Sequence, residues 1–81
     1  MADTREQIEM RLADVRAQRD EAEAEAARCA RELTRLTSGL EPLLSVDTDL
    51  VRATADAYAD AVTRLKCLDA EAGSLRRLLM A

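Results

Sequence analysis

Apolar residues recur along this chain at alternating spacings of three and four positions, in two runs separated by a short break. The first run consists of Ile8, Leu12, Val15, Arg19, Ala22, Ala26, Cys29, Leu33, Leu36 and Leu40. The second run consists of Leu44, Asp47, Val51, Thr54, Tyr58, Ala61, Leu65, Leu68, Ala72, Leu75 and Leu79. Only Arg19, Asp47 and Thr54 depart from the apolar rule. A repeat that averages about 3.5 residues indicates two helices wound around each other, and the members of both runs are called the seam residues below.

Local signals mark the start and the end of the first helix. Thr4 and Gln7 fit the Ser/Thr-x-x-Glu/Gln capping box that often opens a helix. Gly39 suits the position just after a helix end, and Pro42 prevents the helix from continuing easily. The sequence therefore predicts a first helix over about residues 4–38.

A connection over about residues 39–46 follows, and a second helix is predicted over about residues 47–80. Either Ser45 or Asp47 can cap this second helix, because both side chains can accept a hydrogen bond from a free backbone N–H. Gly73 lies at an outward-facing position, and the apolar spacing continues in phase beyond it. We expect the helix to continue through Gly73; the alternative is a helix end there, followed by a short final turn.

A short connection between two long helices makes them antiparallel, with residue i beside roughly residue 86 − i. The expected fold is all-α, an antiparallel two-helix coiled-coil hairpin. In this register Arg19 lies close to Asp69 and Glu71, where its head can meet a carboxylate, and Tyr58 lies beside Cys29.

The 81 residues form a single helical-hairpin domain, 1–81, and a chain this short rarely builds a deep core. Hydrophobic residues make up 48% of the sequence, yet many of them are alanines, which bury little area. Burial along one seam alone falls well short of the entropic cost of ordering the chain, and helix hydrogen bonding and dispersion bring the sum only to marginal stability. We therefore expect the hairpin to self-associate, as a homodimer that forms a four-helix bundle, or to join a larger protein assembly.

The second helix is the better candidate for such contacts. Its flanks beside the seam carry Leu50, Ala57 and Leu78 on one side and Ala55 and Val62 on the other, whereas the flanks of the first helix are mostly charged. Further apolar residues gather at the connection and at the open end of the hairpin. The candidate partner-binding residues are Leu50, Tyr58, Val62, Leu78, Leu43, Leu44, Met80 and Arg19.

Two of these candidates also have simpler explanations. Tyr58, the only aromatic residue, can be a seam filler opposite small residues, or an interface anchor whose hydroxyl reaches a partner. Arg19 can be a surface arginine whose stem lies along the seam, or a residue that sets register or contacts a partner.

The residues that usually carry chemistry are scarce. There is no His, and Cys29 and Cys67 lie about ten residues apart in the expected register, too far for an intramolecular disulfide. We expect reduced thiols; the alternative is an intermolecular bridge through Cys67. The carboxylates within residues 20–25 point in several directions and are expected to form a solvated face. The sequence predicts no enzyme, no cofactor, no metal site and no small-molecule ligand.

Charge and hydropathy limit the partners further. Twelve basic and sixteen acidic residues are interleaved and give a net charge of −4, which does not suit nucleic acid or an anionic membrane surface. No stretch reaches the length of a membrane span, and the N-terminus lacks the features of a signal peptide. A cytoplasmic location is expected, in the host cytosol or in a virion if the chain is phage-encoded.

The leading hypothesis is a non-catalytic protein–protein interaction or assembly module that self-associates or docks the face of its second helix on a partner. The alternative is a small acidic inhibitor or adaptor, encoded by a phage or mobile element, that blocks a host complex by occlusion. Its basis is small size and acidic charge.

Overall fold

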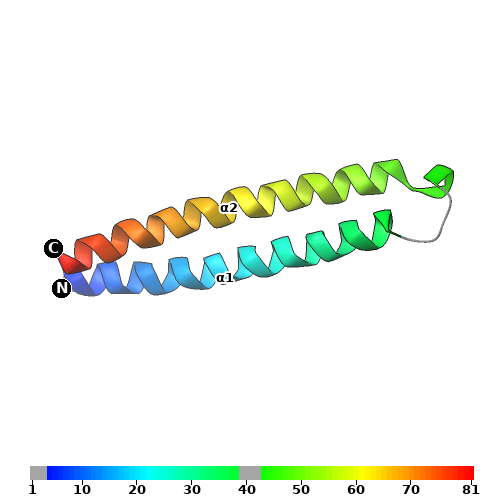
Figure 1. Ribbon diagram of the computed structural model, residues 1–81. Coiled ribbons are helices and arrows are strands. Elements are labelled where there is room, and N and C mark those ends of the chain that lie inside the picture. Colours follow the sequence, from blue (N-terminus) through cyan, green and yellow to red (C-terminus); the bar gives the residue numbers. More distant parts are fainter. Residues whose placement is uncertain (1–3, 39–42) are drawn as a thin grey trace.

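The computed structural model describes residues 4–38 and 43–81, and it is built from two long helices (Figure 1). Helix α1 spans Thr4–Thr37, and helix α2 spans Thr48–Met80. A single 3-10 turn, η1, spans Leu43–Ser45 and leads into α2. The start of α1 and the end of α2 lie at the same end of the molecule, so the helices are antiparallel (Figure 1). The predicted all-helical hairpin is confirmed; it measures 62 × 19 × 17 Å.

Asp47 caps the start of α2. Its side-chain Oδ1 accepts a hydrogen bond from the backbone N–H of Leu50 at 3.0 Å, while its own backbone is extended, with φ −77° and ψ 97°. Of the two candidate caps, Asp47 therefore fills the position. Ser45 instead closes η1.

The structure describes both ends of α1 but not residues 39–42, which follow its C-terminal end. Thr4 is already the first helical residue, so its hydroxyl does not occupy the capping position, and the expected box with Gln7 is not formed. At the other end the backbone N–H of Ser38 donates to the carbonyl of Thr34 at 2.9 Å, and the helix stops at Thr37. The predicted stop signals within 39–42 lie outside the described residues.

Helix α2 runs without interruption through Gly73, as the apolar phase predicted. A methyl group added at this glycine would meet only the ends of the Arg77 and Arg76 side chains, at 3.9 and 4.0 Å. Both distances are ordinary van der Waals contacts with flexible groups. Packing therefore does not explain the absence of a side chain at position 73.

The core consists of one row of seam residues from each helix. Its buried members are Leu12, Val15, Ala22, Ala26 and Cys29 from α1, and Ala61, Leu68 and Ala72 from α2. The tightest cluster lies in the half of the hairpin near the open end, where Leu65, Leu75 and Leu79 pack against it. Toward the connection, Leu33, Leu36 and Val51 are only half-buried. The seam residues are thus more completely buried in the half of the hairpin near the open end than in the half near the connection.

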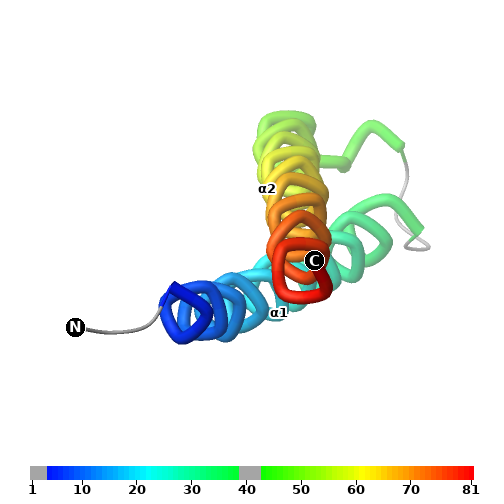
Figure 2. Tube along the Cα trace, turned by 90° about the vertical axis from the view of Figure 1, so that its left-hand side faces the viewer, coloured from blue at the N-terminus to red at the C-terminus, as the bar shows by residue number. Residues whose placement is uncertain are grey.

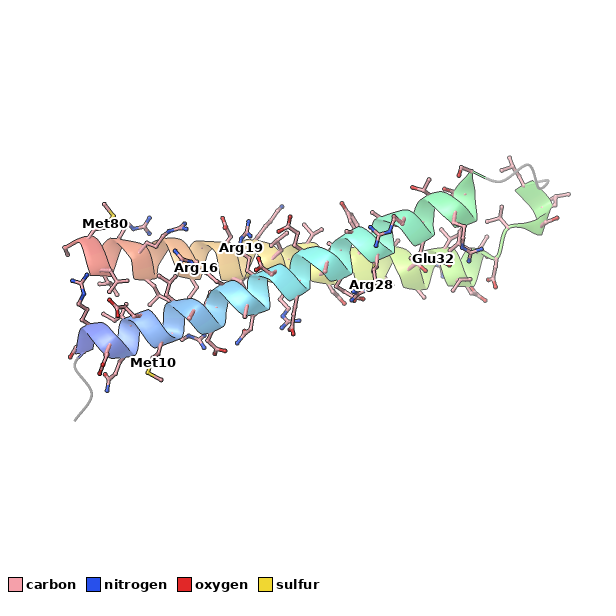
Figure 3. The ribbon with its side chains drawn as sticks, turned by 90° about the horizontal axis from the view of Figure 1, so that it is seen from below. Met10, Arg16, Arg19, Arg28, Glu32 and Met80 are labelled. Carbon is pink, nitrogen blue, oxygen red and sulfur yellow. The ribbon has the colours of Figure 1, made fainter. Side chains whose placement is uncertain are left out.

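Ion pairs between the helices support the expected register. Arg11 Nη2 lies 2.7 Å from Glu71 Oε1, and Arg19 Nε lies 2.9 Å from Asp69 Oδ1. Each partner lies within about one helical turn of the position that the register assigns. Figure 2 shows that the helix axes run at an angle to each other, and in Figure 3 they cross midway. Because of this crossing, a single register number describes the pairing only approximately.

Candidate protein interaction surface

The apolar partner-binding candidates lie in three separate places on the described surface. Leu43 and Leu44 project from η1, and Leu44 is fully exposed. Leu50 and Leu78 share one flank of α2, with exposed fractions of 42% and 59%. They stand roughly 42 Å apart along the axis at 1.5 Å per residue. Met80 is exposed at the open end. These candidates therefore lie along one side of α2 and at the two ends of the hairpin, and they do not form one compact patch.

Tyr58 and Val62 lie along α2 between Leu50 and Leu78. Tyr58 occupies a seam position but keeps 39% of its surface exposed, and it is not among the buried residues. Val62, on the opposite flank of α2, is half-buried.

Arg19 is held by carboxylates of its own chain. Besides Asp69, its Nη1 lies 3.4 Å from Glu23 Oε2 and 3.6 Å from Asp20 Oδ1. The hydrogen bond to Asp69 is the main reason that the pKa of Arg19 is raised above its ordinary value. Arg19 thus makes the expected contact with a carboxylate across the seam, whereas Glu71 pairs with Arg11.

Two hollows that share Ala57 lie between α1 and α2, and Ala57 belongs to the same flank of α2 as Leu50 and Leu78. One hollow of about 320 Å³ is lined by Arg28, Cys29, Glu32, Ala53, Thr54 and Ala57. The adjoining hollow of about 280 Å³ is lined by Ala22, Glu25, Ala57, Asp60, Ala61 and Arg64. We call these two hollows the alanine groove. The apolar flank of Leu50, Ala57 and Leu78 is evident in the sequence. That Ala53 and Ala57 line hollows beside α1 is not, because this depends on how α1 lies beside α2.

The rim of the alanine groove on α1 is made of charged pairs. Glu25 pairs with Arg28, and Glu32 pairs with Arg35. These arginine hydrogen bonds lower the pKa of both glutamates below the ordinary value. The thiol of Cys29, whose Sγ lies 3.8 Å from Glu25 Oε1, is buried, and its burial raises its pKa. A buried, protonated thiol suits a core residue better than a nucleophile.

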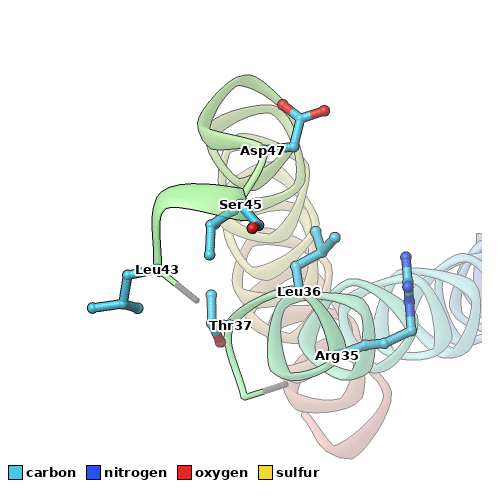
Figure 4. A pocket seen from close by; sticks show the side chains of 7 residues that line it. Arg35, Leu36, Thr37, Leu43, Ser45 and Asp47 are labelled. Carbon is cyan, nitrogen blue, oxygen red and sulfur yellow. The ribbon is translucent and has the colours of Figure 1, made fainter. Parts of the chain in front are cut away.

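Two further hollows lie at the ends of the hairpin. At the open end, where Figure 3 labels Arg16 and Met80, a groove of about 450 Å³ has Leu12 and Leu79 in its lining and Arg16 and Arg76 beside them. At the connection, a hollow of about 230 Å³ lies between Leu36 and the segment from Leu43 to Asp47, and the side chain of Leu43 points away from it (Figure 4).

The two cysteines are free and differ in environment: Cys29 is buried and Cys67 is exposed. Within residues 4–38 and 43–81, no group of three or more His, Cys, Asp or Glu side chains is placed to hold a metal ion. In the same part of the chain, neither helix combines the length and the apolar character needed to cross a membrane.

Comparison with known proteins gives no match: no protein family fits the chain, and no curated protein or solved structure is similar to it.

Proposed function

We propose that this protein is a non-catalytic assembly module that self-associates, with two hairpins forming a four-helix bundle. The observation that carries the proposal is the amount of surface the hairpin leaves exposed. Its accessible surface is 6178 Å². A compact folded monomer of 8.9 kDa exposes about 4800 Å². The excess of about 1400 Å² exceeds the roughly 800 Å² that each partner buries in a stable interface of standard size.

The shape and the core support the same conclusion. The radius of gyration is 18.3 Å, against about 12 Å for a compact domain of this length. In the part of the chain that the structure describes, four of the eight buried residues are alanines, and Val15 is the largest side chain that is fully buried. A second hairpin would cover further apolar surface, and each large aliphatic side chain it buried would add about 1.5–3 kcal/mol.

The proposal that the module is not an enzyme rests on the residues available. The chain has no His, and the Cys29 thiol is buried with a raised pKa, which favours its unreactive, protonated form. We propose a cytoplasmic location, because both cysteines are free thiols, as is usual for proteins of the reducing cytosol.

Light scattering coupled to size-exclusion chromatography, over the micromolar range, tests the proposal directly. We expect a mass of twice 8.9 kDa. A hairpin that unfolds cooperatively but has the mass of one chain at every concentration would overturn the proposal. It would then favour the alternative of a small inhibitor that acts by occluding a host complex.

A pair of matched variants makes this test specific. Changing both Leu50 and Leu78 to Lys places charges on the side of α2 that carries the alanine groove, and we expect the mass to fall to that of a monomer. Met10 is also exposed, on the outer face of α1, with an exposed fraction of 69%. Met10→Lys is therefore the control, and it should leave the mass unchanged.

A further inference from the structure

We propose that the second copy docks antiparallel on the alanine-groove side of α2, so that Asp60 of each chain pairs with Arg64 of the other across a two-fold axis. This inference rests on the proposed function, since it specifies the geometry of the same self-association. It assigns a reciprocal ion pair to two residues that have no other evident role.

A second row of residues on α2 repeats at spacings of three and four, beside the seam. It consists of Leu50, Ala53, Ala57, Asp60, Arg64 and Cys67. All six are exposed. Each helix of a four-helix bundle contacts two neighbours, and therefore needs two adjacent stripes of this spacing. The seam serves the contact with α1, and this second row is available for a helix of another chain.

The small residues of this row leave room for the side chains of an incoming helix. Ala53 and Ala57 line the two hollows of the alanine groove, with volumes of about 320 and 280 Å³. Larger residues stand further out along the same side, Leu50 near the start of α2 and Leu78 near its end. Small side chains at the centre let two helices approach closely, and the leucines can then close the ends of the contact.

Asp60 and Arg64 are opposite charges one helical turn apart, and both are exposed. Among residues 4–38 and 43–81, neither of them forms an ion pair with any other side chain. When two identical helices lie antiparallel and the two-fold axis passes midway between two residues, each of the two residues faces the other residue of the second copy. One arrangement therefore forms two Asp60–Arg64 contacts at once.

The charge distribution along α2 also favours the antiparallel arrangement. Residues 47–60 contain four acidic side chains and one basic side chain, whereas residues 61–80 contain four basic and two acidic ones. Antiparallel helices place the acidic half of one copy beside the basic half of the other. Parallel helices would place like charges together, which opposes association.

Shifts by one heptad distinguish the proposed register from its neighbours. In the proposed register Ala57 lies opposite Cys67 of the second copy, and Asp60 lies opposite Arg64. A shift in one direction brings Asp60 against Glu71, where two carboxylates repel. A shift in the other direction places Asp60 opposite Ala57 and leaves its charge without a partner. The reciprocal ion pair therefore selects one register of the three.

Disulfide crosslinking tests this register with a thiol that the chain already has. Ala57→Cys, made together with Cys29→Ala, should form a disulfide-linked dimer through Cys67 of the second copy under mild oxidation. Cys29 is removed because it lines the same hollow as Ala57 and would compete within the chain. Ala59→Cys in the same background is the control, since Ala59 is equally exposed but faces away from the second row.

A covalent dimer from Ala57→Cys and not from Ala59→Cys supports the proposal. If the protein is dimeric by light scattering but the two variants crosslink equally, or neither does, the docking geometry is wrong and the self-association stands. If the parent chain is monomeric, both proposals fail.

Charge reversal gives an independent test. Asp60→Arg and Arg64→Asp each turn two attractive contacts into repulsive ones, and each should weaken dimerisation by roughly tenfold. The double variant restores both pairs with opposite sign, and sedimentation equilibrium should show an affinity close to that of the parent. Because both residues are exposed, the helicity of each variant should be unchanged. Failure of the double variant to recover the affinity would overturn the proposed pairing.

Discussion

Arg19 Nε donates a hydrogen bond to Asp69 Oδ1 across the two helices, at 2.9 Å. Arg19 occupies a seam position that an apolar residue would normally fill, and it lies between Val15 and Ala22, both of which are buried. Its stem covers the seam while its head reaches the flank of α2. This contact, together with the Arg11–Glu71 pair, connects the halves of the chain over the tightly packed part of the hairpin.

The Arg19–Asp69 contact should be measurable as a coupling between the two positions. Asp69→Ala is expected to lower the urea midpoint of unfolding in the parent chain, because Arg19 loses its main partner. In a chain that already carries Arg19→Ala, the same change should have little effect. Equal effects of Asp69→Ala in both backgrounds would show that the pair does not contribute to stability.

Removing the cap of α2 should destabilise the hairpin. Asp47→Ala leaves the backbone N–H of Leu50 without its side-chain acceptor, at a cost of about 1 kcal/mol in the free energy of unfolding. Asp47→Asn keeps an acceptor oxygen and should lose much less. Urea unfolding followed by circular dichroism measures both variants. A comparable loss in the two would mean that the charge, and not the hydrogen bond, is the important feature.

Gly73 offers a stabilising substitution. Gly73→Ala should raise the free energy of unfolding by about 1 kcal/mol, because alanine is the better helix former and its methyl group meets no close contact. Ala70→Gly, at an exposed position of α2, is the reverse control and should cost a similar amount. Thermal unfolding of the two variants gives the comparison. A Gly73→Ala variant less stable than the parent would indicate that position 73 is in contact with something outside the hairpin.

Acid should weaken the hairpin through Glu25 and Glu32. Both have a folded-state pKa below the ordinary value of 4.5, since Arg28 and Arg35 stabilise their charged forms. Their contribution to stability is therefore fully present above pH 4.5, and it is lost as the pH falls through the lowered folded-state pKa values.

Urea midpoints between neutral pH and about pH 3 measure this dependence. The double variant Arg28→Gln, Arg35→Gln removes the cations while keeping polar side chains, and its stability should fall less steeply on acidification. Identical slopes for the parent and the variant would show that the two glutamates are not responsible.

The apolar spacing of three and four determined that there are two helices and which stripe of each helix faces the other. The short connection between them determined that they are antiparallel. These features follow from local periodicity and from a short connection, and both can be seen in the sequence. The sequence also limited the cap of α2 to Ser45 or Asp47 and favoured a helix continuous through Gly73; the structure assigns the cap to Asp47 and shows the helix uninterrupted. The eight buried residues within 4–38 and 43–81 are all seam residues, because burial in a two-helix pair follows the stripe directly.

Only the tertiary structure decided how well each seam position is covered, which carboxylate each cross-helix arginine contacts, and which side of α2 is hollowed. Tyr58 fits the stripe but remains exposed, Arg11 and not Arg19 contacts Glu71, and Ala53 lines a hollow between the helices. These features depend on the angle and distance between the two helices. That geometry results from the sizes of all the facing side chains together, so no single segment of the sequence specifies it.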